Sequence, residues 1–178
     1  MKCSFCDVPN VPFRGNASFD DMKAQFYKAI NLFPDVKYTE RLNVHFARMG
    51  DGSFNDAVLD FADWMYTNKH EIKKDTGLSI ETLHPVFKTM FPKGKKTKSM
   101  VDRWASIKNA IYNGQAGLQL SINSTCEDQR TEMFGGMQTP LIEVAEFASS
   151  LPEPIGRKYC LNFAYASGNE VDGARLAE

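Results

Sequence analysis

The chain has 178 residues, 43% of them hydrophobic, so it is long and apolar enough to bury a core, which excludes a disordered protein. Its 21 lysines and arginines nearly balance its 22 aspartates and glutamates, which excludes a strong overall field that would draw the protein to nucleic acid or membrane. No apolar run is long enough to cross a bilayer and no secretion signal begins the chain, so we expect a cytoplasmic protein without membrane contact.

Helical and strand patterns alternate along the chain. Apolar stripes at helical spacing predict helices over residues 18–33, 57–77, 100–111 and 139–148, and Ser18 with Asp21 has the spacing of a capping box. The predicted strands are Arg41–Met49, Val86–Phe91, Leu118–Ile122 and Tyr159–Tyr165. Because helices separate these strands, the pattern predicts an α/β fold, a parallel sheet with flanking helices. We expect residues 1–178 to form a single domain, a partial (β/α) barrel with fewer strands than a closed barrel has.

Polar loops follow the predicted strands, and in such folds these loops carry the chemistry. They are residues 50–53, 123–127 and 167–170. At the N-terminus, Cys3-Ser4-Phe5-Cys6 places two thiols at a spacing that can bind one metal centre, whereas an iron–sulfur cluster takes about four sulfur ligands, or three when a substrate takes the last. In the reducing cytosol, cysteines are expected to be thiols or metal ligands.

The pair alone also fits half a zinc site or a chance pairing. Cys126, in a loop beside the expected site, is either a replacement ligand or a bystander thiol, and Cys160, inside a predicted strand, is expected in the core.

Several motifs resemble one enzyme family, in order along almost the whole chain. Cys3-Ser4-Phe5-Cys6 resembles the end of the Cys-x-x-x-Cys-x-x-Cys signature of radical S-adenosylmethionine (SAM) enzymes, where an aromatic residue often precedes the last cysteine. Within that superfamily, the 23S rRNA adenine-C2 methyltransferases have Met-Gly-Glu-Pro-Leu-Leu-Asn, which is similar to residues 49–55, Met-Gly-Asp-Gly-Ser-Phe-Asn. Their Leu-Ser-Leu-His-Ala, then acidic-acidic-x-Arg-x-Glu, is similar to residues 120–124 and to Glu127-Asp128-x-Arg130-x-Glu132. Residues 163–170 resemble the family's Glu-Tyr followed by Gly-Val-Asn-Asp.

The resemblance implies a cofactor site and indicates which residues would form it. Cys3 and Cys6 would bind a four-iron four-sulfur (4Fe-4S) cluster, and the residues expected to bind SAM are Phe5, Gly50, Asp51, Ser121 and Asn123. Asp51 would accept hydrogen bonds from the SAM ammonium, while Ser121 and Asn123 would contact the ribose and neighbouring groups. The implied substrate is an adenine of RNA, rRNA or tRNA, or a nucleotide, and the implied electron donor is a protein such as a flavodoxin. Lysines would line the entrance for RNA, at positions 93, 95, 96 and 98.

The chain also departs from the family. The first signature cysteine would fall ahead of Met1, and the family's C-terminal methyl-carrying cysteine has no counterpart. Asp51-Gly52 replaces Glu-Pro, and Asn123 replaces His. These departures predict a truncated radical SAM domain, methyltransferase-like and incomplete as given. The alternative is a cofactor-free or zinc-binding α/β fragment, or a binding module without catalytic activity.

Overall fold

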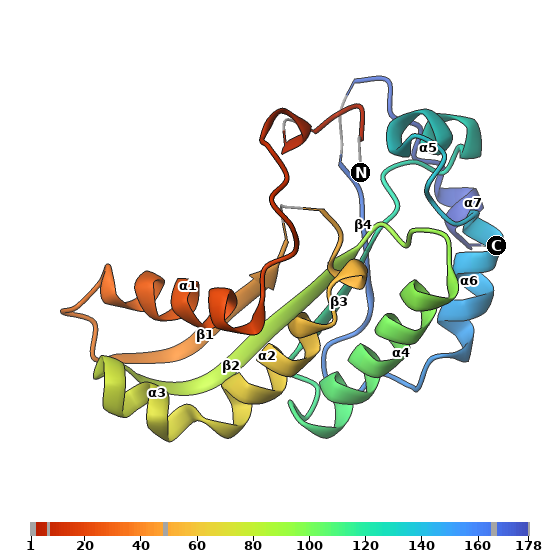
Figure 1. The fold of residues 1–178 in the computed structure, drawn as a ribbon. Coiled ribbons are helices and arrows are strands. Elements are labelled where there is room, and N and C mark those ends of the chain that lie inside the picture. Colours follow the sequence, from red (N-terminus) through yellow and green to blue (C-terminus); the bar gives the residue numbers. More distant parts are fainter. Residues whose placement is uncertain (1–2, 7, 48–49, 165–166, 178) are drawn as a thin grey trace.

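The computed structural model describes residues 3–6, 8–47, 50–164 and 167–177 (Figure 1). Met49 and Tyr165, which belong to predicted strands and motifs, lie outside these ranges. The helices are α1 (Phe19–Asn31), α2 (Ala57–Thr67), α3 (Lys69–Thr76), α4 (Lys95–Ala110), α5 (Glu127–Phe134), α6 (Leu141–Ser150) and α7 (Gly173–Ala177). The strands are β1 (Tyr38–Phe46), β2 (Ser79–Thr89), β3 (Gly117–Ser121) and β4 (Cys160–Asn162), and short 3-10 helices occur at η1 (Val8–Asn10) and η2 (Gly52–Phe54).

The four strands form one sheet in the order β1-β2-β3-β4, and every neighbouring pair is parallel. The predicted α/β class and parallel sheet are therefore confirmed. The order never reverses along the sheet, as it does at the switch point of a doubly wound fold, and it is the order of consecutive strands in a (β/α) barrel. β1 and β4 are the two edge strands and do not pair with each other.

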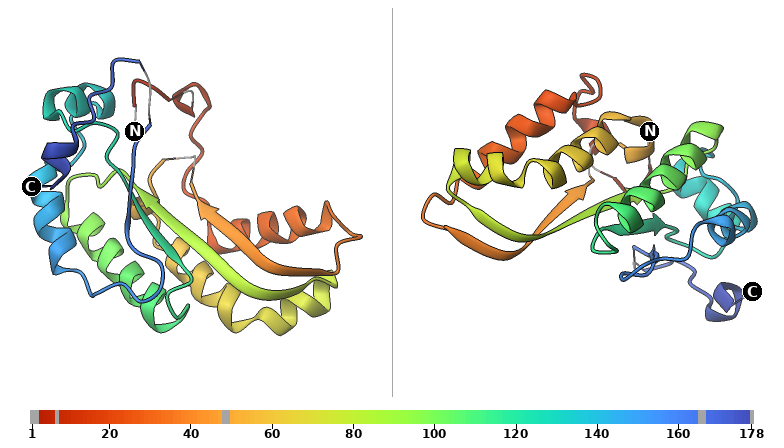
Figure 2. Two further views of the ribbon diagram at one scale, coloured as in Figure 1. Left: turned by 180° about the vertical axis from the view of Figure 1, so that it is seen from behind. Right: turned by 90° about the horizontal axis from the view of Figure 1, so that it is seen from below.

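One face of the sheet packs against helices. Leu42, Val44 and Phe46 of β1 point to this side, and the ring of Phe46 contacts Trp104 of α4 at a centroid distance of 5.8 Å. Trp104 also stacks on Phe87 of β2 at 5.3 Å and donates its indole N–H to Gly117 O at 2.9 Å. Figure 2 shows α1, α2 and α4 on one side of the curved sheet. The main core lies between these helices and the sheet.

The alternate strand residues face the other way, because successive side chains of a strand point to opposite faces. The register pairs Asn43 with His84, His45 with Val86, and Lys88 with Gln119. We call this surface, which carries Asn43, His45, His84, Lys88 and Gln119, the polar face.

Local signals placed some helix ends correctly and missed others. Ser18 caps α1 as predicted: its Oγ accepts from Asp21 N at 3.1 Å, and Asp21 Oδ2 accepts from Ser18 N at 2.9 Å. The helix predicted over 57–77 is instead two helices that meet at Asn68, whose φ of −107° and ψ of 27° are not helical. Gly77 ends the second one in the left-handed conformation, with φ 74°.

Other boundaries differ from the prediction, and for β2 the reason is its pairing with neighbouring strands. β2 begins seven residues earlier than predicted, at Ser79, because it pairs with the full length of β1. Pro85 is tolerated inside it since β3 pairs with β2 only from Val86 onward. β4 is shorter than predicted, and α5 was not predicted at all. None of the helices in the described ranges combines the length and apolar character that a membrane span needs.

Candidate cofactor site

The carboxyl ends of β1, β2 and β3 meet at a small pocket of about 190 Å³. Six residues predicted from sequence line it: Cys3, Phe5, Gly50, Asp51, Ser121 and Asn123. The segments after β1 and β3 meet here because parallel strands bring their carboxyl ends to one edge of the sheet, and the N-terminal cysteine turn lies beside them. Cys6 is not a lining residue, but its N–H donates to Cys3 O at 3.2 Å, so both cysteines belong to one turn.

A larger groove of about 620 Å³ lies between α1 and the outer edge of β1. Its lining is mostly apolar, with Phe26 and Ile30 of α1 opposite Leu42 and Val44 of β1, and none of the predicted site residues contributes to it. We place the candidate site at the smaller pocket because that pocket combines thiol, carboxylate, hydroxyl and amide groups.

Helix α5 positions the cysteine turn. Ser4 N donates to Met133 O at 2.9 Å, and the Phe5 ring meets the Phe134 ring edge-on at 5.6 Å. Cys3 packs against a small cluster made by Met90, Met133 and Phe134. A helix that the sequence patterns missed therefore holds the N-terminal segment against the pocket.

The cysteines offer part of a metal site. Burial raises the pKa of the Cys3 thiol, and the neighbouring Cys6 and Asp51 raise it further, so without a cation Cys3 favours the protonated form. The described ranges contain no group of three or more His, Cys, Asp or Glu side chains placed to hold a metal ion. Two thiols do not complete the ligand set of a 4Fe-4S cluster or of a tetrahedral zinc ion.

The other two cysteines do not line the pocket. Cys126 is the residue before α5, and its N–H donates to Ser124 Oγ at 3.0 Å. Cys160 was predicted in the core, but this is wrong: it is exposed, because β4 is an edge strand.

Asp51 already holds the pocket together. Its Oδ1 accepts from Ser53 N at 2.9 Å and from Ser53 Oγ at 2.6 Å, while Oδ2 accepts from Met90 N at 2.8 Å. These bonds join the loop after β1 to the end of β2. A carboxylate has about four lone-pair positions, so a ligand donor can reach only what these three bonds leave open.

Asn123 and Ser121 differ in whether their side chains form hydrogen bonds within the protein. Asn123 is buried in the left-handed conformation, φ 64°, which suits asparagine, and its Oδ1 accepts from Ala164 N at 3.0 Å. Its position therefore has a structural reason for asparagine where the resembling family has histidine. Ser121 Oγ forms no hydrogen bond to any described residue, so its hydroxyl is available to a ligand.

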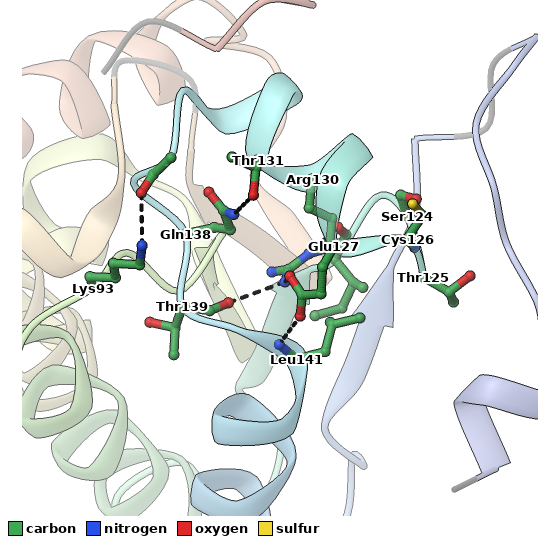
Figure 3. Close-up of polar contacts among 12 residues, drawn as sticks. Lys93, Ser124, Thr125, Cys126, Glu127, Arg130, Thr131, Gln138, Thr139 and Leu141 are labelled. Carbon is green, nitrogen blue, oxygen red and sulfur yellow. Dashed lines mark hydrogen bonds and ion pairs between the residues drawn. The ribbon is translucent and has the colours of Figure 1, made fainter.

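Arg130 is a residue whose role the motif did not explain. It is completely buried, and its guanidinium donates to Ile122 O at 3.2 Å, Thr139 O at 3.1 Å and Glu127 Oε2 at 3.0 Å (Figure 3). Glu127 Oε1 in turn accepts from Leu141 N at the start of α6. The pair thus joins the end of β3 to α5 and α6. The sequence signal was an arginine three residues after a glutamate, a spacing that brings the two together on a helix.

The predicted lysine entrance is partly helical. α4 begins at Lys95, so three of the four lysines lie in its first turns and not in a loop. Lys96 pairs with Asp56 at 2.8 Å, and Lys93 donates to Gly136 O at 3.1 Å. Lys88, which sequence analysis did not single out, lines the pocket itself. The sequence feature that could have identified Lys88 is its position as a charged residue between Phe87 and Thr89, inside a predicted buried strand.

Comparison of the chain with protein-family models, with curated proteins and with solved structures gives no match.

Proposed function

We propose that this chain is a radical SAM-type domain, similar to rRNA adenine-C2 methyltransferases, that binds SAM and an iron–sulfur cluster to act on RNA or a nucleotide. The positions of the predicted site residues in the fold support this proposal. Six residues named from motif resemblance alone, from three separate segments, line one pocket at the carboxyl edge of a parallel sheet. The two strand-end segments would meet in any parallel sheet, but the cysteine turn follows no strand, so its place beside them is the part of the arrangement that supports the proposal.

Each residue has a role within the proposal. Cys3 and Cys6 supply two sulfur ligands, and a third thiolate must come from another source, since the described residues hold none nearby. A 4Fe-4S cluster would supply the electron that cleaves SAM. Asp51 would accept from the SAM ammonium with its remaining lone pairs, and Ser121 would bond the ribose through its unused hydroxyl.

The substrate and partners follow from the same resemblance. An RNA adenine would have to leave its stack to reach a pocket at the sheet edge, so basic groups near the pocket would bind its backbone. Lys88 lines the pocket and is one such group. A flavodoxin-like protein would deliver the electron.

A cofactor-free binding module is the second candidate. It is favoured by the observation that Asp51 and Asn123 both have structural hydrogen bonds, which explain these residue types without any ligand. A zinc site has less support, because only two thiols are close together and tetrahedral zinc needs four ligands.

Anaerobic reconstitution with iron, sulfide and excess small thiol separates these candidates. We expect the wild-type chain to bind iron with the visible absorption of a cluster, and Cys3→Ser and Cys6→Ser to lose it. Cys160→Ser, an exposed cysteine away from the pocket, is the matched control and should load normally. SAM affinity measured by calorimetry should fall in Ser121→Ala. Wild-type protein that binds neither iron nor SAM, or iron loading that is indifferent to Cys3 and Cys6, would refute the enzyme proposal.

A further inference from the structure

Basic side chains gather on the polar face of the sheet, on the opposite side from the helical core. His45 on β1 is paired with Val86 of β2, and Val86 is paired with Gly117 of β3. Lys88 lies two residues beyond Val86 on the same strand and therefore on the same face. Neighbouring strands are about 4.8 Å apart, and residues two positions apart on a strand are separated by about 6.6 Å, so the side chains of His45 and Lys88 can both reach a group bound near Val86.

Arg157 adds a third basic group to this face from a distant segment. Gly117 has no side chain, and the Arg157 guanidinium occupies the space above it: a Cβ at Gly117 would lie 3.1 Å from Cζ and both terminal nitrogens. The Arg157 backbone is held in place because its N–H donates to Gly114 O at 3.0 Å. β1, β2 and the segment before β4 thus each contribute one basic group around Val86.

These basic groups lack acidic partners. None of His45, Lys88 and Arg157 takes part in the ion pairs found among the described residues. Arg157 has a buried terminal nitrogen without a hydrogen-bond partner. Buried polar groups normally have partners, so this nitrogen retains a donor that a bound anion could use.

The electrostatics agree with an unneutralised cluster. Burial lowers the pKa of His45, and the charges of Lys88 and Arg157 lower it further. Burial also lowers the pKa of His84, followed by the charges of Arg41 and Arg157. The positive field at this face opposes further protonation and would be relieved by a bound anion.

We propose that His45, Lys88 and Arg157 form a binding site for a phosphate group. A planar guanidinium and an ammonium are the groups that proteins use for phosphate, and a neutral imidazole adds one donor. Lys88 also lines the candidate cofactor pocket, so the phosphate would lie directly beside that pocket. The identity of its carrier, a mononucleotide or an RNA backbone, rests on the proposed function, whereas the phosphate site itself does not.

Calorimetry on the full chain without iron tests the site, with inorganic phosphate, AMP and a short oligouridylate as probes. We expect Arg157→Gln and Lys88→Gln each to weaken binding of phosphate and AMP about tenfold or more, the usual worth of a hydrogen bond between charged groups. Arg103→Gln and Lys73→Gln remove exposed charges on α4 and α3 and should bind within about twofold of wild type. Far-UV circular dichroism checks that each variant is folded.

The probes also separate the two carriers. Tighter binding of AMP than of inorganic phosphate, with no further gain for the oligouridylate, assigns the site to a mononucleotide. Much tighter binding of the oligouridylate, with a steep salt dependence, assigns it to an RNA backbone. The site is refuted if no probe binds at millimolar concentration, if the two site variants bind like the controls, or if a glutamate-rich peptide binds more tightly than phosphate. Because iron is absent, these outcomes are independent of the reconstitution experiment.

Discussion

Replacing the buried Arg130 by alanine tests how the elements around the candidate site are held together. The guanidinium donates to two backbone carbonyls, Ile122 O and Thr139 O, and to the carboxylate of Glu127. In Arg130→Ala the carbonyls at the end of β3 and before α6 would lose their donor in a place that water reaches poorly. A cavity would remain where the side chain was, since Arg130 is 0% exposed.

The size of the effect can be worked out from these contacts. Each buried carbonyl without a donor costs about 1–3 kcal/mol, so the two together cost about 2–6 kcal/mol. The ion pair adds little, at most about 1 kcal/mol, because the Glu127 side chain is 43% exposed and can be solvated. We therefore expect Arg130→Ala to lower the free energy of unfolding by about 3–5 kcal/mol, a large part of the total for a domain of this kind.

Urea unfolding followed by tryptophan fluorescence and far-UV circular dichroism measures this change. Arg103→Ala, an exposed arginine of α4, is the matched control and should change the free energy of unfolding by no more than about 0.5 kcal/mol. Glu127→Gln keeps an acceptor for Arg130 and should cost less than Arg130→Ala. If Arg130→Ala unfolds at the same urea concentration as the control, the guanidinium does not bridge β3, α5 and α6.

Two further changes test the sheet and the loop before β4. Gly114→Ala should lower the melting temperature strongly, because Gly114 has φ 78° and an added Cβ would lie 2.1 Å from Ile155 O; Gly136→Ala, with φ 72° and open space around it, carries only the backbone strain and should melt higher. An equal loss in both variants would contradict the close approach. Burial and two nearby arginines lower the pKa of His84 in the folded protein below its usual 6.5. At pH values below 6.5 the unfolded chain therefore binds more protons than the folded chain. The free energy of unfolding should be full above pH 6.5 and fall as the pH drops from 6.5 towards the folded pKa. In chemical unfolding at a series of pH values, His84→Gln should show a smaller loss, and an unchanged pH dependence would refute this origin.

Local signals were sufficient for much of the fold. The capping box of α1, the glycine at the end of α3 and the alternation of helix with strand act over a few residues, so they were visible in the sequence. The same holds for the candidate site, where residues at the ends of strands could be expected to meet once the sheet was taken as parallel. Cys3, Asp51 and Ser121 do line one pocket.

Other features had no local signal. α5 carries few apolar residues, and its buried side includes Arg130, which a search for apolar stripes cannot detect. The start of β2 depends on where β1 lies, and the exposure of Cys160 depends on β4 being an edge strand. Each of these outcomes is decided by contacts between segments that are distant in sequence.

The sequence by itself determined the α/β class, the parallel order of the strands and the set of residues to look for at their ends, since propensity, capping and periodicity depend on near neighbours. Only the tertiary structure decided that Asp51 and Asn123 already have hydrogen-bond partners, and that Arg157 crosses over Gly117 to join His45 and Lys88. The reason is physical: hydrogen-bond satisfaction and the gathering of like charges are properties of the assembled sheet, and no single segment contains them.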